Sequence, residues 1–368
     1  MVRFGVAGVG VRGVEHAQLI FDGKVPGAEV TAVCDTDPGK LEAFRAKHPG
    51  IATYENTTAM IAGGGIDAVL IATPHYDHPA IAMEAFAAGL HVMNEKPAGV
   101  YTQQVRAMDE AYHKTGKARG LVYGIMYNQR TNPIFRKMRD MVQGGALGAL
   151  KRTSWLITDW YRPQAYYDSG GWRATWKGEG GGVLINQCPH NLDLWQWICG
   201  MPQRVHAFTH MGKWHDIEVE DDVTAYVEYE NGATGIFITS TADCPGNNRF
   251  EVLGDKGKLV FEHDKLTHYK LATPEREFNR VNREMFAHPA FESTQIDCPG
   301  EYPQHEGVLR DFVRAIKKEG ELVARGEEGI HGLMISNAMH LSGWLGKTVE
   351  LPLDEDLFLA ELKKQGGA

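Results

Sequence analysis

The chain has 368 residues, of which 43% are hydrophobic and 23% are charged. This is the composition of a globular protein, and it excludes a collagen, a coiled coil and a disordered chain. The length predicts about two domains. Aspartate and glutamate outnumber lysine and arginine by 47 to 38, and the resulting net charge of -9 disfavours a nucleic-acid partner.

The cysteines and the hydropathy pattern indicate where the protein works. The 5 cysteines are scattered and form no CxxC pair, so the sequence predicts no disulfide framework and favours a reducing compartment. Met1 leads directly into an apolar strand pattern. No stretch approaches the ~18 apolar residues of a membrane span. We therefore expect a cytoplasmic protein with no membrane partner.

The first third of the chain alternates short apolar runs with amphipathic segments, which is typical of a parallel sheet wound with helices. Strands are predicted at residues 3–7, 30–34, 68–72, 91–94 and 120–125. Helices are predicted at residues 14–21, 38–47, 78–88 and 103–114. We expect residues 1–125 to form a doubly wound, Rossmann-type, NAD-binding α/β domain.

The pattern changes after a helix expected at residues 132–142. Alternating runs at residues 150–157, 205–210, 223–229, 234–239 and 258–262 predict an antiparallel sheet, with hairpin loops at 230–232 and 254–257. Two helices at 304–318 and 328–345 and a short strand at 348–351 follow. We expect residues 126–368 to form an α+β substrate-binding and oligomerisation domain with a large, mostly antiparallel sheet. Its C-terminal helices can pack against either domain.

A GxGxxG pattern over residues 8–13 follows the first predicted strand and precedes a helix. Gly8 permits a tight turn, Gly10 lets the backbone approach a pyrophosphate, and Gly13 lets the helix pack on the strand. Asp35 ends the next strand, where a carboxylate accepts the ribose hydroxyls of a dinucleotide and repels a 2′-phosphate. The alternative is a glycine-rich turn with a surface aspartate.

Other residues at the carboxyl ends of the predicted strands complete the expected cofactor site. The neighbours of Asp35 include no arginine, which favours NAD, whereas Lys40 keeps NADP as the alternative. His75 and His78 form an HxxH pattern without a recognisable third ligand, so no metal is expected. The expected cofactor-binding residues are Gly8, Gly10, Val11, Arg12, Gly13, Asp35, Thr73, Pro74, His78, Glu95 and Lys96.

Lys96 lies just past the apolar run 91–94, and Pro97 biases it toward an extended backbone. From these residues alone, a solvated loop lysine is the alternative to a lysine in the ligand crevice. Five segments resemble, in their order and spacing, the Gfo/Idh/MocA oxidoreductases over essentially the whole chain: GVAGVGVRG, IATPHYDHPAIAMEAFAAGLHV, NEKP, VEDDVTAYVEYENGATG and EVLGDKGKLVFE. The resemblance implies two domains, a nicotinamide cofactor, a sugar or cyclic polyol substrate, and Lys96 as a catalytic residue.

The segment 178–200 carries the second expected catalytic group. Relatives of inositol dehydrogenase have an Asp, three residues and a His here, the His serving as proton acceptor; His190 matches, but Asn186 replaces the Asp. We expect a helix with Asn186 as its N-cap, which would place Asn186 and His190 on one face. An amide supplies no charge to favour an imidazolium. We therefore expect a neutral His190 as general base, oriented by Asn186 or Asp193, with a buried structural histidine as the alternative.

The stretch from Trp160 to Trp176 is rich in aromatic residues, arginine and glycine. Flat rings stack on the apolar face of a sugar, and polar side chains bond to its hydroxyls. An interface or core patch is an equal alternative. The expected substrate-binding residues are Lys96, Arg130, Trp160, Tyr161, Arg162, Trp172, Arg173, Asn186 and His190.

Together these features predict an NAD-dependent dehydrogenase that acts on a secondary ring hydroxyl of a sugar, glycoside or inositol. Two other functions are the alternatives: a redox-neutral NAD-dependent glycosidase that acts through a transient keto sugar, and a non-enzymatic sugar-sensing regulator. The presence of both Lys96 and His190 favours the dehydrogenase. We also expect a homodimer or homotetramer formed through the C-terminal sheet.

Overall fold

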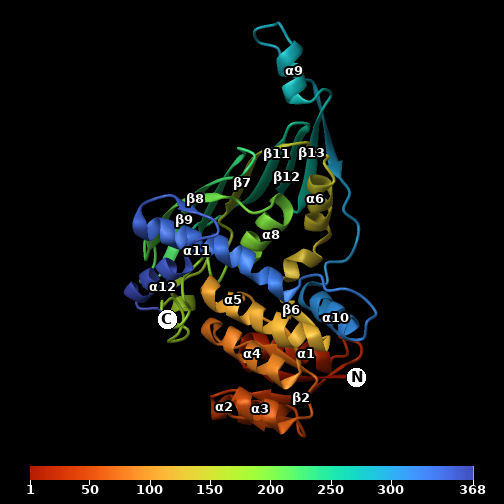
Figure 1. Cartoon of the computed structure of the whole chain (residues 1–368), viewed down its shortest axis with the longest axis vertical. Helices are drawn as coiled ribbons and strands as arrows, with labels where there is room; N and C mark the ends of the chain where they lie inside the picture. Colours follow the sequence, from red (N-terminus) through yellow and green to blue (C-terminus); the bar gives the residue numbers. More distant parts are fainter. Residues whose placement is uncertain (368) are drawn as a thin grey trace. The chain divides into compact units, whose positions relative to one another are not determined.

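The computed structural model describes residues 1–367, and the chain divides into two compact units (Figure 1). The first unit contains residues 1–131, 178–180 and 302–333, and the second contains the rest of the described chain. No helix within residues 1–367 combines the length and the apolar character needed to cross a bilayer.

The first unit is built on a parallel sheet with the strand order β3-β2-β1-β4-β5-β6. Its strands are β1 (Val2–Ala7), β2 (Ala28–Cys34), β3 (Ala52–Tyr54), β4 (Ala68–Ile71), β5 (His91–Asn94) and β6 (Tyr123–Ile125). The predicted Rossmann sheet is confirmed, with one strand, β3, that the sequence analysis missed. The order reverses between β1 and β4, and such a switch point is where open α/β sheets bind ligands.

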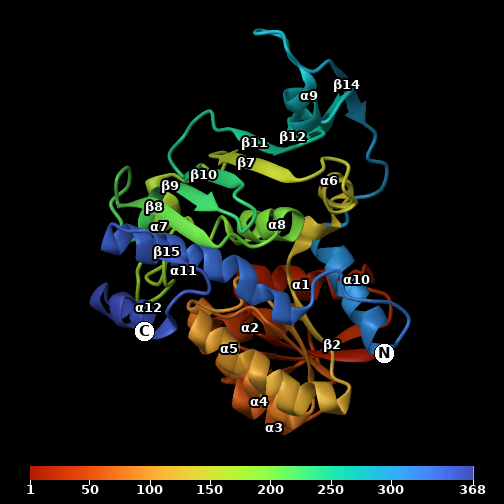
Figure 2. The same ribbon diagram turned by 45° about the horizontal axis from the view of Figure 1, so that its top comes forward.

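Helices cover this sheet through buried apolar side chains, such as Ile20 of the first helix and Leu41 and Phe44 of the second. They are α1 (Val11–Phe21), α2 (Pro38–Lys47), α3 (Thr57–Gly63), α4 (His78–Ala88), α5 (Thr102–Ala111) and, from late in the chain, α10 (Gln304–Ile316). Figures 1 and 2 show α10 beside α1. Phe312 of α10 packs on Phe4 of β1 at a ring distance of 6.0 Å, so α10 belongs to the core of the first unit.

The second unit contains a nine-stranded sheet with the order β14-β13-β12-β11-β7-β10-β9-β8-β15. All neighbouring pairs are antiparallel except β10 with β7, and the predicted mostly antiparallel sheet is confirmed. The predicted hairpins lie between β9 and β10 and between β11 and β12. The strands are β7 (Leu150–Ile157), β8 (Arg204–Met211), β9 (Glu220–Glu228), β10 (Thr234–Ser240), β11 (Asn248–Gly254), β12 (Gly257–Glu262), β13 (Lys265–Leu271), β14 (Phe291–Ile296) and β15 (Val349–Glu350).

One face of this sheet forms the core of the second unit. Trp155 of β7 stacks on Phe250 of β11 at 4.2 Å, and Trp195 stacks on Phe237 of β10 at 5.4 Å. Helices α6 (Pro133–Gln143) and α8 (Pro189–Cys199) cover this face, α6 through Phe135. The remaining helices of the chain are α7 (Gln164–Tyr167), α9 (Glu275–Val281), α11 (Gly329–Leu345) and α12 (Glu355–Lys364).

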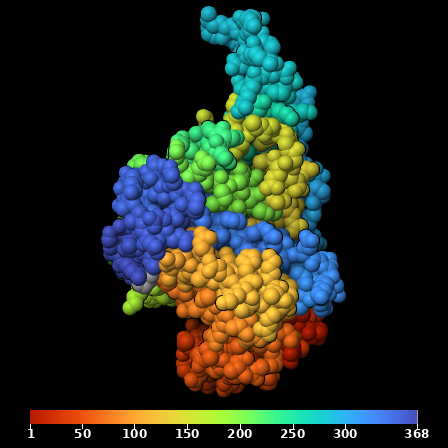
Figure 3. Space-filling view, in the orientation of Figure 1, coloured from red at the N-terminus to blue at the C-terminus, as the bar shows by residue number. Residues whose placement is uncertain are grey.

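Short helical turns occur at His75–Asp77, Tyr112–Gly116, Lys117–Arg119, Asn128–Thr131 and Gly326–Glu328. Between β13 and β14 the chain forms α9 and a loop in which Met285 is 86% exposed and Phe286 is 88% exposed. In Figure 3 this segment, coloured cyan, projects beyond the strands that it connects.

Candidate active site

The phosphate loop has the backbone geometry that its glycines predict. Gly8 has φ +89°, and a Cβ added there would lie 2.7 Å from the carbonyl oxygen of Ala72. A Cβ on Gly13 would lie 1.8 Å from the carbonyl oxygen of Gly8, so only glycine lets α1 pack this closely. A Cβ on Gly10 would meet nothing within 4 Å. The loop thus leaves open the side of Gly10 where a pyrophosphate is held in Rossmann domains.

Asp35 is fixed against this loop. Its Oδ2 accepts the backbone N–H of Val9 at 2.9 Å, and its Oδ1 accepts that of Asp37 at 2.9 Å. The Nζ of Lys40 lies 3.7 Å from Oδ1, on a half-exposed side chain. Within residues 1–367 the buried hydroxyl of Thr73 has no hydrogen-bond partner. The loop, the carboxylate and this hydroxyl fit a dinucleotide with free ribose hydroxyls.

The residues after β5 place Lys96. Glu95 is 6% exposed, and its Oε1 lies 2.6 Å from Nε2 of His16 on α1. Its Oε2 accepts the backbone N–H of Lys96 at 2.9 Å. Burial by itself would raise the pKa of Glu95, but the hydrogen bond and charge of His16 outweigh burial and lower the pKa. Glu95 is therefore an ionised carboxylate that anchors the backbone of a half-buried Lys96.

The two histidines of the HxxH pattern bond to backbone carbonyl groups. His78 lies 2.8 Å from the carbonyl oxygen of Pro97 through Nδ1 and 2.9 Å from that of Thr73 through Nε2, so it ties two strand-end loops together. His75 contacts the carbonyl oxygen of Glu179 at 2.9 Å. Burial lowers the pKa of His78 and lowers that of His75 to about 3. No cluster of three metal-ligating side chains occurs among residues 1–367.

In the second unit the start of α8 corrects one prediction. The helix begins at Pro189 with Cys188 as its N-cap, so the expectation that Asn186 is the N-cap was wrong. The backbone N–H of Asn186 instead bonds to the carbonyl oxygen of Gly182 at 2.9 Å, within a run of turns. Proline fits the first helical turn, and it disfavours a helical backbone in the residue before it. His190 lies in the first turn and is 9% exposed, whereas Asn186 lies outside the helix.

A buried ion pair holds the turns that lead to His190. Glu220 accepts the backbone N–H groups of Gly182, at 2.9 Å, and of Leu184, at 2.9 Å, and Nε2 of His340 lies 3.0 Å from its Oε2. Both side chains are fully buried. Burial alone would raise the pKa of Glu220, but the charge of His340 and the donated hydrogen bonds lower it. The role of Glu220 was not predicted from the sequence, because its backbone partners lie 38 and 36 positions away.

The aromatic stretch gathers several predicted substrate residues around Tyr166, which the sequence analysis did not select. Its phenol oxygen accepts hydrogen bonds from Arg173 at 2.8 Å and from Asn186 at 3.3 Å. The guanidinium carbons of Arg162 and Arg173 lie 5.2 and 4.6 Å from the Tyr166 ring centre. The guanidinium carbon of Arg173 also lies 4.8 Å from the ring centre of Trp172. Asn186 is thus linked to the aromatic stretch.

The remaining predicted substrate residues have different surroundings. Trp160 donates from Nε1 to Oδ1 of Asn191, the neighbour of His190, at 3.1 Å. Tyr161 is 47% exposed. Arg130 is 1% exposed in the first unit, where its guanidinium pairs with Glu328. Arg130 is therefore engaged in an internal ion pair.

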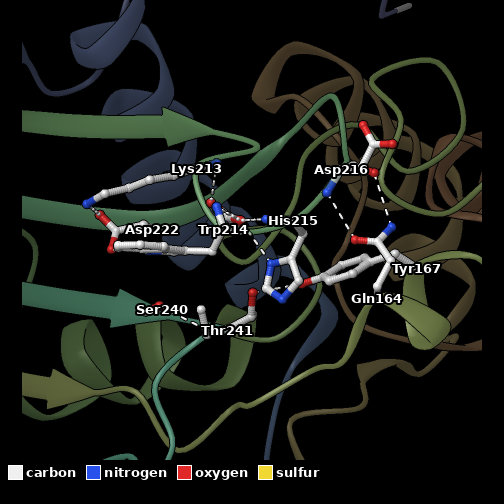
Figure 4. A network of polar contacts seen from close by, with 11 residues as sticks. Gln164, Tyr167, Lys213, Trp214, His215, Asp216, Asp222, Ser240 and Thr241 are labelled. Carbon is white, nitrogen blue, oxygen red and sulfur yellow. Dashed lines mark hydrogen bonds and ion pairs between the residues drawn. The ribbon is translucent and has the colours of Figure 1, made fainter.

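A polar network anchors the aromatic stretch to the loop 212–217 (Figure 4). Gln164 donates to the carbonyl oxygen of Asp216 and accepts its backbone N–H at 3.0 Å. Tyr167 donates to Oγ1 of Thr241 at 2.7 Å, and its ring lies 4.9 Å from that of His215. Asp221 accepts the backbone N–H groups of residues 213–215.

Comparisons with known proteins agree with this architecture. The family model described as "Oxidoreductase family, NAD-binding Rossmann fold" matches residues 2–123, and "GFO/IDH/MocA C-terminal domain" matches residues 135–260. The two matches cover well over half of the sequence. The chain belongs to the Gfo/Idh/MocA family of oxidoreductases.

Some relatives match this chain over nearly its whole length. Levoglucosan dehydrogenase of Pseudarthrobacter phenanthrenivorans is 24% identical over 95% of this chain and 98% of the relative. Inositol 2-dehydrogenase of Rhizobium meliloti is 26% identical over 92% of this chain and 95% of the relative. The WlbA dehydrogenase of Bordetella pertussis, solved with NADH and UDP-GlcNAcA, has a TM-score of 0.80 and 26% identity, covering 96% of this chain and 98% of that one. The first unit therefore contains the family's NAD-binding Rossmann domain.

The Asp35→Ala variant should bind NADH about 10- to 100-fold more weakly, because the ribose hydroxyls lose a charged acceptor. The preference for NAD over NADP should also narrow, because the negative charge that repels a 2′-phosphate is removed. Fluorescence titration with NADH and NADPH measures both effects without a substrate. The control is Glu42→Gln, an exposed acid on α2. Unchanged NADH affinity in Asp35→Ala would contradict the assignment.

The Glu220→Gln variant should lower the melting temperature, because it leaves His340 without its buried counter-charge. Breaking a buried ion pair costs about 3–5 kcal/mol. Glu230→Gln, in the exposed β9–β10 turn, is the matched control. Calorimetry of the two variants at neutral pH makes the comparison. Equal melting temperatures would show that the ion pair does not hold the turns.

Proposed function

We propose that this chain is an NAD-dependent dehydrogenase that oxidises a secondary ring hydroxyl of a sugar, glycoside or inositol, or reduces the corresponding ketone. The observation that carries the proposal is the cluster of tryptophan, tyrosine and arginine side chains that adjoins the segment bearing His190. Such a cluster offers flat apolar faces and hydrogen-bond donors together. The named substrates of the relatives, levoglucosan and inositol, have the same chemistry.

In this proposal Lys96 and His190 act on the same hydroxyl group. The ammonium group of Lys96 holds the hydroxyl oxygen and favours its loss of a proton. A neutral His190 accepts that proton while the carbon–hydrogen bond breaks and the carbonyl forms. When bound, NAD supplies the nicotinamide carbon that accepts the hydride. Asn186 contributes no charge, so the imidazole stays a competent base at neutral pH.

The two units divide the work in this proposal. The NAD-binding residues and Lys96 lie in the first unit, and His190, the aromatic cluster and the proposed oligomerisation surface lie in the second. The reducing, cytoplasmic compartment favoured by the scattered cysteines belongs to the same proposal.

Lys96→Met and His190→Asn should each lower kcat/KM by about 10²- to 10⁴-fold, because each removes a group that assists the proton transfer. NADH affinity should stay within about twofold of the wild type. The assay is NADH formation at 340 nm with a panel of sugars, glycosides and inositols. The controls are Lys114→Met and His288→Asn, which change exposed residues.

Two outcomes of this panel would contradict the dehydrogenase. Cleavage of a glycoside without net NADH would indicate a redox-neutral glycosidase. Binding of a sugar without either reaction would indicate a regulator. Full activity of both variants would contradict the roles of Lys96 and His190.

A second copy of the chain is the proposed partner of the outer face of the second sheet. Phe208, Tyr226 and Ile236 are 61%, 40% and 42% exposed on β8, β9 and β10. Tyr226 lies opposite Ile236 in register, and alternation puts all three side chains on the face opposite to the buried Phe237. Contiguous apolar side chains on a sheet face are typical of an interface between subunits.

Ile236→Lys should shift the oligomer toward monomer, because an unpaired charge would be buried at the interface. Analytical ultracentrifugation over a concentration series measures the shift. Met285→Lys, in the exposed loop after α9, adds the same charge away from this face. A monomeric wild type, or an oligomer that is unchanged by Ile236→Lys, would contradict the proposed interface.

A further inference from the structure

Tyr166 is surrounded by hydrogen-bond donors. Its phenol oxygen lies 2.8 Å from Nη1 of Arg173, 3.3 Å from Nδ2 of Asn186 and 3.4 Å from Nε2 of Gln187. All three side chains belong to the second unit. In each of these three contacts the phenol oxygen is the acceptor.

The phenol hydrogen therefore points away from these three groups. A guanidinium has five N–H donors and no acceptor, and the two amides present their nitrogen atoms to the phenol. A cationic donor also polarises the hydroxyl group that accepts from it, which makes that hydroxyl a stronger donor in turn. Tyr166 is half-buried, so part of its side chain is open to a ligand.

The backbone beside Tyr166 is held firmly enough to aim that hydrogen. Figure 4 shows Gln164 and Tyr167, on either side of it in α7, bonded to the loop 212–217 and to Thr241. Ser169 bonds to the carbonyl oxygen of Tyr166 at 2.7 Å. The Tyr166 ring packs against Arg173 and Arg162. A donor fixed in this way loses little conformational entropy when a ligand binds.

We propose that Tyr166 binds the substrate directly by donating its phenol hydrogen to one oxygen of the carbohydrate ring. Arg173, Asn186 and Gln187 position the phenol for this contact. The inference rests on the dehydrogenase function proposed above, and it specifies an additional substrate-binding residue. It also gives Asn186 a second role, because its amide nitrogen bonds to the phenol.

The recognised oxygen must be able to accept a hydrogen bond. A ring hydroxyl oxygen and a carbonyl oxygen both meet this requirement, whereas a carbon–hydrogen group at the same position does not. A site that bonds to one hydroxyl discriminates strongly against the analogue that lacks it, because a buried polar group is left unpaired. The enzyme should therefore be selective at one carbon of the ring.

The test measures kcat/KM of Tyr166→Phe and of the wild type on a sugar that the enzyme oxidises, called the parent sugar. It repeats the measurement on the monodeoxy analogues of that sugar. The variant should lose about 10- to 100-fold in kcat/KM on the parent sugar. On one deoxy analogue the variant and the wild type should have about the same kcat/KM, because the oxygen that the phenol contacts is already missing from that analogue. NADH affinity and melting temperature show whether the variant is folded. Tyr269→Phe on β13 removes a phenol oxygen elsewhere in the unit and is the control.

Each outcome decides a different claim. If Tyr166→Phe lost the same factor in kcat/KM on every analogue, Tyr166 would be a purely structural residue and the inference would be overturned. An unchanged kcat/KM on the parent sugar would overturn it too. Arg173→Met removes the polarising donor and keeps the phenol. Its loss in kcat/KM should be smaller than that of Tyr166→Phe, and it should disappear on the same deoxy analogue. A wild type that oxidises no sugar or inositol would instead overturn the dehydrogenase proposal, and the inference with it.

Discussion

Acidic side chains hold the irregular segments of this candidate site by accepting their backbone N–H groups. Asp35 holds the phosphate loop, Glu95 holds Lys96, Glu220 holds the turns before α8, and Asp221 holds the loop 213–215. These segments lie outside the sheets and helices, so their N–H groups have no ladder partner, and a buried unpaired N–H is costly. A carboxylate can accept several hydrogen bonds at once and forms strong, charge-assisted ones. Functional loops are thereby ordered without regular secondary structure.

This arrangement makes the segments sensitive to acid. Glu95 and Glu220 are buried, and a histidine lies beside each carboxylate, His16 beside Glu95 and His340 beside Glu220. Both carboxyl groups have a pKa below the ordinary value for glutamate. A depressed pKa contributes stability that is present above the pKa of the unfolded chain and is lost as the pH falls toward the folded value. His75 acts in the same direction, because its pKa is lowered in the folded chain. Below about pH 6.5 the unfolded chain binds a proton at His75 more readily than the folded chain does, so stability falls as the pH falls.

The sequence predicted the features that depend on local pattern. Alternating runs located most strands of both sheets, and the GxGxxG spacing located the phosphate loop with Asp35 at the end of β2. The strand β3 was missed because it has only three residues and is not fully buried. The start of α8 was misplaced because Asn186 is a good N-cap by type, whereas Pro189 decided where the helix begins.

Features that depend on distant pairing could not be predicted in the same way. Glu220 and His340 are ordinary residues of a strand and a helix until folding brings them together around the turns at 182–184. Tyr166 was one tyrosine among several, and only the donors gathered at its oxygen distinguish it. The acid and the tyrosine would be recognisable from sequence only through their partners. The partners of Tyr166 lie 7, 20 and 21 positions away, and the backbone partners of Glu220 lie 36 and 38 positions away.

The crystal structure of a complex with NADH and an oxidised carbohydrate tests the central claim most directly. We expect Nζ of Lys96 and a ring nitrogen of His190 both to lie about 2.6–3.2 Å from one hydroxyl oxygen. The carbon bearing that hydroxyl should lie about 3–3.5 Å from the nicotinamide C4. A complex in which the two side chains contact different oxygens, or in which either one points away from the sugar, would contradict the account.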